Sequence, residues 1–342
     1  MGDTPHLRLD VEVLDRNIAA MAQRARAGGA RLRPHAKTHK CPQVGRRQLA
    51  AGADGLTVAT IGEAEVFAEA GVTDLFIAYP LWVDADAASR LRALAGRVRL
   101  AVGCDSAVAG ANLAGLPLEV MVEVDSGHHR TGVRPADAGT LAAALAGSGL
   151  TVRGVFTFPG HSYAPGAGRG AAQEEAAALA EAARAMAAAG VPAGVTSGGS
   201  TPSVAFAGPG VVDELRPGVY VFGDAQQVEL GTIGFDEVAL TVVATVVSLA
   251  GGRVVTDAGS KALGADRAGW ASGYGRVLGE PDARVVALSE HHSTISWPGP
   301  LPALGSRVLV VPNHVCNTVN LAREYHLSSG GTWPVAARGR NC

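Results

Sequence analysis

Lysine is scarce in this chain, and its few positions are the ones best suited to covalent chemistry. Only three of the 29 Lys and Arg residues are lysine, namely Lys37, Lys40 and Lys261. An arginine keeps its proton because its pKa stays above about 12, whereas a lysine amine can lose its proton and attack a carbonyl. A lysine retained in such an arginine-rich chain therefore indicates a position that a guanidinium cannot fill.

Lys37 is the strongest candidate nucleophile. It lies in the segment RPHAKTHK (Arg33–Lys40), where cationic neighbours and partial desolvation favour the neutral amine that forms imines. We predict that Lys37 forms a Schiff base. Two alternatives stay open at this point: a basic loop that binds an anion by charge alone, and lysines left by chance in a composition biased toward arginine.

The glycine-rich segment VTSGGSTPS (Val195–Ser203) is a candidate anion site. It leads into a short helix expected over Pro202–Ala207, and backbone N–H groups at a helix N-terminus bind anions together with nearby hydroxyls. Beside an imine-forming lysine, a phosphate cradle indicates pyridoxal 5′-phosphate, whereas the alternative is an ordinary serine-rich loop. The predicted phosphate contacts are Ser197, Gly198, Gly199, Ser200 and Thr201.

Two further segments carry side chains that could surround the ring of this cofactor. In DSGHHRTG (Asp125–Gly132), Arg130 is a candidate contact of the phenolate oxygen or of a substrate carboxylate. Asp125 would orient Arg130 or form a structural ion pair with it. His161 and Tyr163 alternate along a stretch that we expect to be extended, so that their side chains share a face. We predict Tyr163 at the pyridine nitrogen and His161 stacked on the ring.

His314 and Cys316 form a candidate metal pair. They alternate in PNHVCNT (Pro312–Thr318) after a predicted strand, which points the imidazole and the thiolate to one side. The pair suits a tetrahedral zinc ion, with His291 or His292, water and a substrate oxygen as candidates for the other ligands. The alternative is a buried histidine beside a core cysteine.

The elements that must position these residues alternate between strands and helices. About eight strand–helix units in the first 235 or so residues predict an α/β fold of the (β/α)8 barrel type. A doubly wound open sheet is the alternative, but no GxGxxG motif opens a βαβ unit. Apolar runs predict strands at Ala30–Ala36, Gly55–Thr60, Asp74–Pro80, Arg97–Gly103, Leu118–Asp125, Leu150–Pro159, Gly194–Ser197 and Leu215–Phe222. Helical spacing follows Asp10 and recurs at Glu63–Ala70, Asp84–Leu94, Pro135–Ala146 and Ala171–Ala189.

The candidate residues fall at the carboxyl ends of these strands, where barrel enzymes build their active sites. Lys37 follows the first strand, Arg130 the fifth, His161 and Tyr163 the sixth, Ser197–Thr201 the seventh, and Tyr220 ends the eighth. Beyond Gly231, β-branched runs separated by Gly and Pro turns predict a smaller all-β domain. We therefore predict a cofactor-binding barrel over residues 1–235 and a β-rich domain with the metal pair over residues 236–342.

The bulk properties exclude several other classes of protein. A length of 342 residues with 47% hydrophobic residues and a net charge of −2 is typical of a globular protein, and no basic run suggests a nucleic-acid partner. We expect a solvated helix rather than a membrane span over Ala171–Ala189, because this alanine-rich run contains Glu174, Glu175, Glu181 and Arg184. The start lacks a secretory apolar region, and the four cysteines show no disulfide framework, which favours the cytoplasm.

Together these motifs resemble the D-serine dehydratase and D-threonine aldolase family. Its members are fold-type III pyridoxal-phosphate enzymes related to alanine racemase. The resemblance extends from about residue 8 to residue 330, with the motifs in order and at compatible spacing. The motifs are RPHAKTHK, TVATIGEAE, DSGHHRTGV, GHSY, SGGSTP, ELRPGVYVFGD and PNHVCNT.

The resemblance implies an alanine racemase-like barrel, a C-terminal β domain and a homodimer with the active site near the subunit boundary. It also implies a divalent metal beside the cofactor, zinc or else manganese. Carried over by motif, Lys37 is the Schiff-base lysine, Ser197–Thr201 and Tyr220 contact the phosphate, Arg130 and Tyr163 lie around the ring, and His314 and Cys316 hold the metal.

The metal pair also bears on the reaction. Aldolases of the family typically have His and Asp at these positions and its dehydratases His and Cys, so Cys316 favours a zinc-dependent dehydratase. One departure is EHHS (Glu290–Ser293), where members often have Glu-His-Gly; the bulkier residue would change the substrate pocket or add a ligand. Lys261 has no assigned role.

We therefore expect a lyase that converts small D-β-hydroxy amino acids into a keto acid and ammonia. Retro-aldol cleavage to glycine and an aldehyde uses the same groups and is the main alternative. A non-catalytic pyridoxal-phosphate carrier is disfavoured by the second domain and its metal pair. A racemase needs a second proton-transfer residue, usually a tyrosine, which the sequence does not identify.

Overall fold

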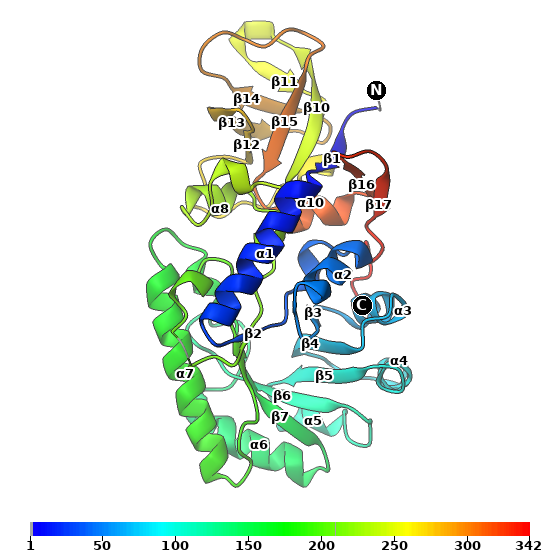
Figure 1. Ribbon diagram of the computed structural model, residues 1–342, viewed down its shortest axis with the longest axis vertical. Coiled ribbons are helices and arrows are strands. Elements are labelled where there is room, and N and C mark those ends of the chain that lie inside the picture. Colours follow the sequence, from blue (N-terminus) through cyan, green and yellow to red (C-terminus); the bar gives the residue numbers. More distant parts are fainter. Residues whose placement is uncertain (1–2, 209) are drawn as a thin grey trace. The chain divides into compact units, whose positions relative to one another are not determined.

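The computed structural model describes residues 3–208 and 210–342 of the chain (Figure 1). Two compact units can be distinguished, which we call the barrel unit and the β unit. The barrel unit comprises Ala20–Lys37, Val44–Gly218 and Arg340–Cys342, and the β unit comprises Met1–Ala19, Thr38–Gln43 and Val219–Gly339.

The barrel unit is built on eight parallel strands in the order β2-β9-β8-β7-β6-β5-β4-β3 (Figure 1). A parallel bridge between His35, just after β2, and Thr57 of β3 closes the barrel, and the Thr57 N–H donates to the Pro34 carbonyl at 2.9 Å. The strands are β2 (Arg31–Leu32), β3 (Leu56–Val58), β4 (Asp74–Pro80), β5 (Arg99–Cys104), β6 (Glu119–Glu123), β7 (Thr151–Phe156), β8 (Thr196–Gly198) and β9 (Glu214–Leu215).

Short polar side chains start several of the helices that cover this sheet. Thr60, Asp84 and Ser106 each accept a hydrogen bond from the backbone N–H three residues later, which is the usual N-cap arrangement. Each cap follows a strand closely, so the chain reverses direction and lays the helix against the sheet. The helices are α2 (Pro42–Ala50), α3 (Ile61–Glu69), α4 (Ala85–Ala95), α5 (Ala107–Ala111), α6 (Ala138–Gly147) and α7 (Gly168–Ala188).

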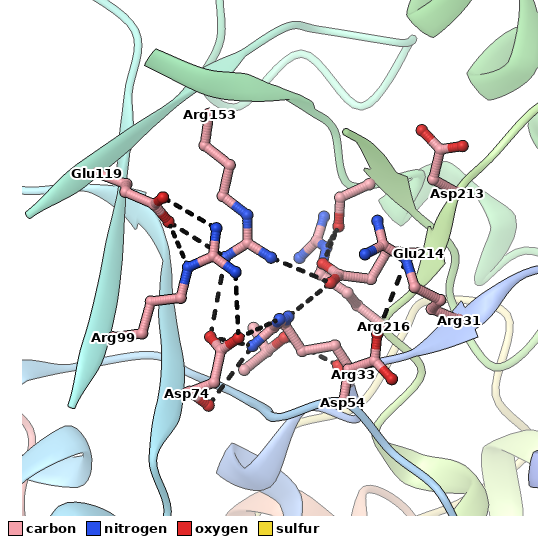
Figure 2. Close-up of polar contacts among 12 residues, drawn as sticks. Arg31, Arg33, Asp54, Asp74, Arg99, Glu119, Arg153, Asp213, Glu214 and Arg216 are labelled. Atoms are coloured by element: carbon pink, nitrogen blue, oxygen red, sulfur yellow. Dashed lines mark hydrogen bonds and ion pairs between the residues drawn. The ribbon is translucent and has the colours of Figure 1, made fainter. Parts of the chain in front are cut away.

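The interior of the barrel has an apolar layer and a charged layer. Phe76, Met121 and Phe156 are buried and pack with Ala101 and Val195 in the apolar layer. The charged layer, which we call the ionic network, lies at the amino ends of the strands: Asp74, Glu119 and Glu214 are the first residues of β4, β6 and β9. They surround Arg33, Arg99 and Arg153 (Figure 2). This end of a barrel serves stability, while the opposite rim carries the chemistry.

The β unit contains a nine-stranded sheet in the order β11-β14-β13-β12-β15-β10-β1-β16-β17. Its strands are β1 (His6–Leu9), β10 (Leu240–Ser248), β11 (Val254–Thr256), β12 (Gly275–Val277), β13 (Glu280–Leu288), β14 (Ser293–Ser296), β15 (Arg307–Pro312), β16 (Glu324–Leu327) and β17 (Thr332–Pro334). The remaining helices of the chain are α1 (Val11–Ala27), α8 (Ala225–Glu229), α9 (Ser260–Leu263) and α10 (Val315–Leu321).

The predicted architecture, a parallel barrel followed by a mainly antiparallel β domain, is confirmed. Two local features differ. The N-terminal β1, which the sequence analysis did not include, pairs antiparallel with β10 and parallel with β16 in the sheet of the β unit. The strand predicted over Leu215–Phe222 stops at Leu215, because Pro217 cannot donate to a strand ladder and a 3₁₀ turn, η5 (Val219–Val221), follows.

No helix in residues 3–208 and 210–342 combines the length and the apolar character that crossing a membrane requires.

Candidate active site

Lys37 lies directly after the first barrel strand, as predicted. It is the middle residue of the 3₁₀ turn η1 (Ala36–Thr38) and is half-buried. Backbone bonds from Arg33 N–H to the Leu215 carbonyl and from His35 N–H to the Pro217 carbonyl tie the preceding segment to the strand beside it. On the other side, the Thr57 N–H binds the Pro34 carbonyl. The segment that precedes Lys37 is therefore hydrogen-bonded to both neighbouring strands and holds the lysine at the carboxyl end of the barrel.

The ring of Phe158 is the centre of the candidate site in the barrel unit. The Lys37 Nζ lies 5.5 Å from the ring centroid and the Arg130 guanidinium carbon 5.3 Å from it, both within the range of cation–π contacts. His128 meets the same ring edge-on at 5.5 Å, and Tyr163 lies 6.3 Å from it. The structure thus brings together Lys37, Arg130 and Tyr163. The sequence analysis missed Phe158; its signal was an aromatic residue two positions after the end of a barrel strand.

The turn that carries Arg130 is shaped by Asp125. This carboxylate accepts hydrogen bonds from Gly127 N–H at 2.9 Å and from His129 N–H at 3.0 Å, and its second oxygen lies 2.7 Å from His129 Nδ1. Burial raises the pKa of Asp125, but these bonds outweigh it and the pKa falls below its ordinary value. Asp125 therefore holds the turn and His129, whereas its expected contact was Arg130.

A buried carboxyl that the sequence analysis missed lines a small pocket next to Phe158. Glu123, the last residue of β6, is 2% exposed, and its Oε1 accepts the Thr131 hydroxyl at 2.8 Å. Its Oε2 has no hydrogen-bond partner among the described residues. Burial raises the pKa of Glu123, and the Coulombic effects of Arg130 and Arg216 oppose this. The pocket, which Arg130 and Phe158 also line, is thus bordered by a buried polar atom without a hydrogen-bond partner among the described residues.

The predicted phosphate loop is held in one shape by internal hydrogen bonds. Gly199, at φ +87°, donates its N–H to Glu175 Oε1 at 2.5 Å. The Ser200 N–H donates to Ser203 Oγ at 3.0 Å, and the Ser200 hydroxyl lies 2.8 Å from that of Ser162. Thr201 is also buried. The loop is therefore a rigid, hydroxyl-rich turn at the carboxyl end of β8.

The side chain of Ser197 lies inside the barrel, closer to the ionic network than the rest of this loop. Its hydroxyl donates to Glu214 Oε1 at 2.9 Å and accepts a hydrogen bond from Arg216 Nε at 2.9 Å. The Arg216 guanidinium lies 5.2 Å from the centroid of the Phe156 ring, between the ionic network and the rim. The Ser197 hydroxyl is thus engaged inside the barrel, and its role as a phosphate contact stays a prediction.

His161 and Tyr163 are not on extended backbone, so the expectation of alternating side chains was wrong. Pro159 precedes a 3₁₀ turn, η3 (Gly160–Ser162), and Tyr163 closes that turn. His161 Nε2 lies 2.8 Å from Glu174 Oε2, but neither of its ring nitrogens has a hydrogen bond of acceptable geometry among the described residues. His161 therefore keeps unused hydrogen-bonding capacity at the barrel rim.

Tyr220, the other predicted phosphate contact, belongs to the β unit. It is buried, in the turn η5 that precedes α8.

The predicted metal pair is also in the β unit, at the start of α10. His314 is the N-cap residue of the helix and Cys316 lies in its first turn, so the alternation that we expected after the strand is replaced by the start of a helix. The two side chains still meet, since the thiol of Cys316 and the imidazole of His314 are hydrogen-bonded. Cys316 Sγ also lies 3.3 Å from Thr38 Oγ1.

Two carboxylates fix the geometry of this pair. Asp266 forms a short contact with His314 Nδ1, which leaves Nε2 as the nitrogen for a metal. The buried Asp224 accepts the N–H of Val315, the residue between the pair, at 3.1 Å. Burial lowers the pKa of His314, but the Cys316 thiolate and Asp266 raise it to about 11. The sequence analysis did not include Asp266, because it lies 48 residues from His314 in the chain.

The further metal ligands proposed from the sequence are not assembled in the structure. His291 and His292 are exposed in the turn between β13 and β14. Among residues 3–208 and 210–342, no group of three or more His, Cys, Asp or Glu side chains is arranged to hold a metal. Lys261, which had no assigned role, pairs with Glu290 at 2.5 Å.

Two known families match consecutive parts of the chain. Residues 9–226 match the family described as alanine racemase, N-terminal domain, and residues 239–328 match the putative serine dehydratase domain. D-threo-3-hydroxyaspartate dehydratase of Delftia sp. (strain HT23) is 38% identical, over 92% of this chain and 91% of the relative. D-threonine aldolase of Arthrobacter sp. is 35% identical, over 98% of this chain and 93% of the relative.

Solved structures agree with these matches. D-threo-3-hydroxyaspartate dehydratase from Delftia sp. HT23 superimposes with a TM-score of 0.90 at 35% identity, over 98% of this chain and 97% of that chain. Two variants of the same dehydratase have also been solved, each with a TM-score of 0.90. One replaces a histidine by alanine, and the other, in a metal-free form, replaces the cysteine two residues later.

Proposed function

Because the chain belongs to the alanine racemase-like family that includes D-threo-3-hydroxyaspartate dehydratase and D-threonine aldolase, we propose that it is a pyridoxal-phosphate- and metal-dependent lyase of D-β-hydroxy amino acids. The reaction we propose is dehydration followed by release of a keto acid and ammonia. The observation that carries this choice is the pairing of His314 with Cys316, since the relative substituted at such a histidine–cysteine pair is a dehydratase.

The residues at the barrel rim fit pyridoxal phosphate. Lys37 offers an amine on the Phe158 ring, Glu123 has a buried oxygen without a partner among the described residues, and Ser200 and Thr201 carry hydroxyls beside the positive-φ Gly199. Lys37 would hold the cofactor aldehyde, and the turn would hold its phosphate. When bound, the cofactor supplies an electron sink that makes the Cα proton of an amino acid acidic.

We assign one residue of the chain to proton transfer and the others to holding the cofactor and the substrate. The Lys37 amine would take the Cα proton, from a half-buried position that limits the access of water. Arg130 lies over Phe158 at 5.3 Å and would hold the cofactor oxygen or the substrate carboxylate. Tyr163 and His161 would flank the ring, and Tyr220 would contact the phosphate.

The donor set of the β unit fits zinc. An imidazole nitrogen and a thiolate are preferred zinc ligands, and a site with open positions is typical of catalytic zinc. His314 and Cys316 would hold the ion, with Asp266 orienting the imidazole. The chemistry supplied there is Lewis-acid activation of the β-hydroxyl as a leaving group. The Cα proton and the β-hydroxyl would leave together as one water molecule, and a second water would hydrolyse the dehydrated product to the keto acid and ammonia.

Retro-aldol cleavage is the second candidate function. It is favoured by the 35% identity to a D-threonine aldolase over 98% of this chain. In this reaction the β-hydroxyl loses its proton to a base, the Cα–Cβ bond breaks, and glycine and an aldehyde form.

Incubation with D-threo-3-hydroxyaspartate, D-serine and D-threonine separates the two reactions. Dehydration predicts stoichiometric ammonia and keto acid, with activity lost on chelation and restored by zinc. Glycine with an aldehyde would refute dehydration in favour of cleavage. Interconversion of D- and L-alanine would indicate a racemase, and cofactor binding without turnover of any substrate would indicate a carrier.

The assembly and location of the enzyme are also proposals. We propose a homodimer, as the family resemblance implies, and a reducing cytoplasm. All four cysteines are free thiols in the structure, which suits a reducing compartment. Light scattering of the purified protein measures the subunit number directly, and a single subunit per particle would refute the dimer.

A further inference from the structure

A buried carboxyl lies directly beneath the candidate phosphate loop. Glu175, on α7, is 1% exposed, and its Oε1 accepts the Gly199 N–H at 2.5 Å. Within the described part of the chain no ion pair at contact distance is found for Glu175, whereas the equally buried Glu214 pairs with Arg33 at 2.6 Å. Burying an ionised carboxyl without an ion-pair partner costs folding free energy, which suggests that Glu175 has a function in the protein.

The loop is shaped around this carboxyl. A Cβ on Gly198 would lie 2.3 Å from Glu175 Oε1, so only glycine admits the carboxyl at this distance. Gly199 has a φ of +87°, which turns its N–H toward Glu175. The position of Glu175 and the course of the loop through Ser200 are therefore set together.

The surroundings of Glu175 disfavour a negative charge. Burial raises its pKa to about 7, while the Gly199 N–H and the Coulombic effect of Arg216 oppose the rise. The elements packed against α7 include η2, β7 and η3, whose titratable groups are Asp137, Arg153 and His161; the pKa of Glu175 is set instead by burial, the Gly199 N–H and Arg216. The carboxyl is thus in an environment that keeps a proton near neutral pH.

We propose that Glu175 is the positioning residue of the phosphate-binding loop and that it acts as a neutral carboxyl. As an acceptor it fixes the Gly199 N–H, and as an uncharged group it leaves the loop free to take a phosphate dianion. Ionisation of Glu175 would place a buried negative charge beneath the phosphate. The inference rests on the proposed function, in which the loop Ser197–Thr201 receives the phosphate of the cofactor.

The test uses pyridoxine 5′-phosphate, which has the phosphate and the ring but no aldehyde to react with Lys37. Its dissociation constant is measured on the cofactor-free protein at pH 6.5 and pH 8.5 for wild type, Glu175→Gln and Glu175→Ala. Glu181→Gln, an exposed change on the same helix, is the matched control. Unphosphorylated pyridoxine reports on the ring site alone, and circular dichroism verifies that each variant is folded.

Glu175→Gln keeps an acceptor for Gly199 but cannot ionise. We expect it to bind pyridoxine 5′-phosphate within about threefold of wild type at pH 6.5 and on the order of tenfold more tightly than wild type at pH 8.5. Glu175→Ala should weaken binding about tenfold at both pH values without changing the binding of pyridoxine. The control should follow wild type throughout.

Two results would overturn the inference. If wild type and Glu175→Gln show the same pH dependence, the carboxyl is not required to be neutral. If Glu175→Ala binds as wild type does, the residue does not position the loop. Failure of the proposed function gives a different signature, because wild type itself would then bind neither pyridoxine 5′-phosphate nor pyridoxal phosphate.

Discussion

Removing the charge of Glu214 should destabilise the protein far more than removing the charge of an exposed carboxylate. Glu214 is 1% exposed, and its Oε2 accepts a hydrogen bond from Arg33 Nε at 2.6 Å. The same oxygen lies 3.7 Å from the Arg153 guanidinium, and Oε1 accepts the Ser197 hydroxyl at 2.9 Å (Figure 2). Glu214→Gln keeps the shape of the side chain but leaves two buried guanidinium groups with one carboxylate fewer.

The expected cost follows from the remaining partners. Breaking a buried ion pair by removing one partner typically costs about 3–5 kcal/mol, because an uncompensated charge stays buried. Burial alone would lower the pKa of Arg33, and Glu214 with Asp74 raises it above its ordinary value. Arg33 keeps two hydrogen bonds to the Asp74 carboxylate, at 2.7 and 3.1 Å, so the loss of stability should fall at the lower end of this range, about 3 kcal/mol.

Equilibrium unfolding in urea, followed by circular dichroism, measures this loss. The matched control is Asp54→Asn, which breaks an exposed pair in which Arg31 Nε lies 3.8 Å from the carboxylate. Exposed pairs contribute about 0–1 kcal/mol, so the control should unfold near the wild-type midpoint. If Glu214→Gln loses no more than Asp54→Asn, the ionic network does not hold the barrel and the reasoning is refuted.

Three further changes test other parts of the structure. Asp266→Asn should weaken zinc affinity about 10–100-fold in a chelator competition while leaving the unfolding midpoint nearly unchanged, and unchanged affinity would show that Asp266 does not orient His314. Gly198→Ala places a Cβ 2.3 Å from Glu175 Oε1 and should lower the free energy of unfolding by about 1–3 kcal/mol. Gly170→Ala, which meets nothing within 4 Å on α7, is its control and should be neutral or stabilising, and equal effects of the two changes would contradict the packing argument. The pKa of Glu175 is about 7 in the folded protein against the ordinary 4.5, so the native state binds this proton more tightly than the unfolded state does. As the pH rises from 4.5 to above 7, the free energy of unfolding of wild type should therefore fall by about 3 kcal/mol relative to that of Glu175→Gln. Parallel stability–pH curves would show that Glu175 does not titrate in this way.

The barrel could be predicted because its elements are local. The strand at Asp74–Pro80 has the same bounds in the structure, because its apolar run Leu75–Ile77 is buried in a parallel sheet. Lys37 was placed at a strand end by its sequence position alone. The first strand, His6–Leu9, escaped prediction because four residues carry too little pattern, and its partners begin at Leu240 and Glu324.

The charged and polar parts of the site could not be predicted in the same way. Hydrophobic patterning assigns charged residues to the surface, yet Arg33 and Glu214 are buried together although 181 residues separate them in the chain. Glu175 looked like a solvated residue of an alanine-rich helix, and only the tertiary structure brings it to Gly199. Such contacts arise from the closure of the barrel, which no local window contains.

Backbone conformation near prolines was the other source of error. Alternation was read as extended structure at His161 and Tyr163 and at His314 and Cys316, but both segments follow a proline and form a 3₁₀ turn and a helix start. The residue types still make His314 and Cys316 candidates for a metal site, because imidazole and thiolate chemistry does not depend on the backbone conformation. The supporting residues, Phe158 and Asp266, required the fold.

The central claim is that Lys37 carries the cofactor, and reduction with borohydride tests it most directly. The purified protein is reconstituted with pyridoxal phosphate, reduced and digested, and the modified peptide is sequenced by mass spectrometry. The account predicts one phosphopyridoxyl group on Lys37 and the loss of the visible absorbance band in Lys37→Ala. A stable adduct on Lys40 or Lys261, or a yellow and active Lys37→Ala, would contradict it.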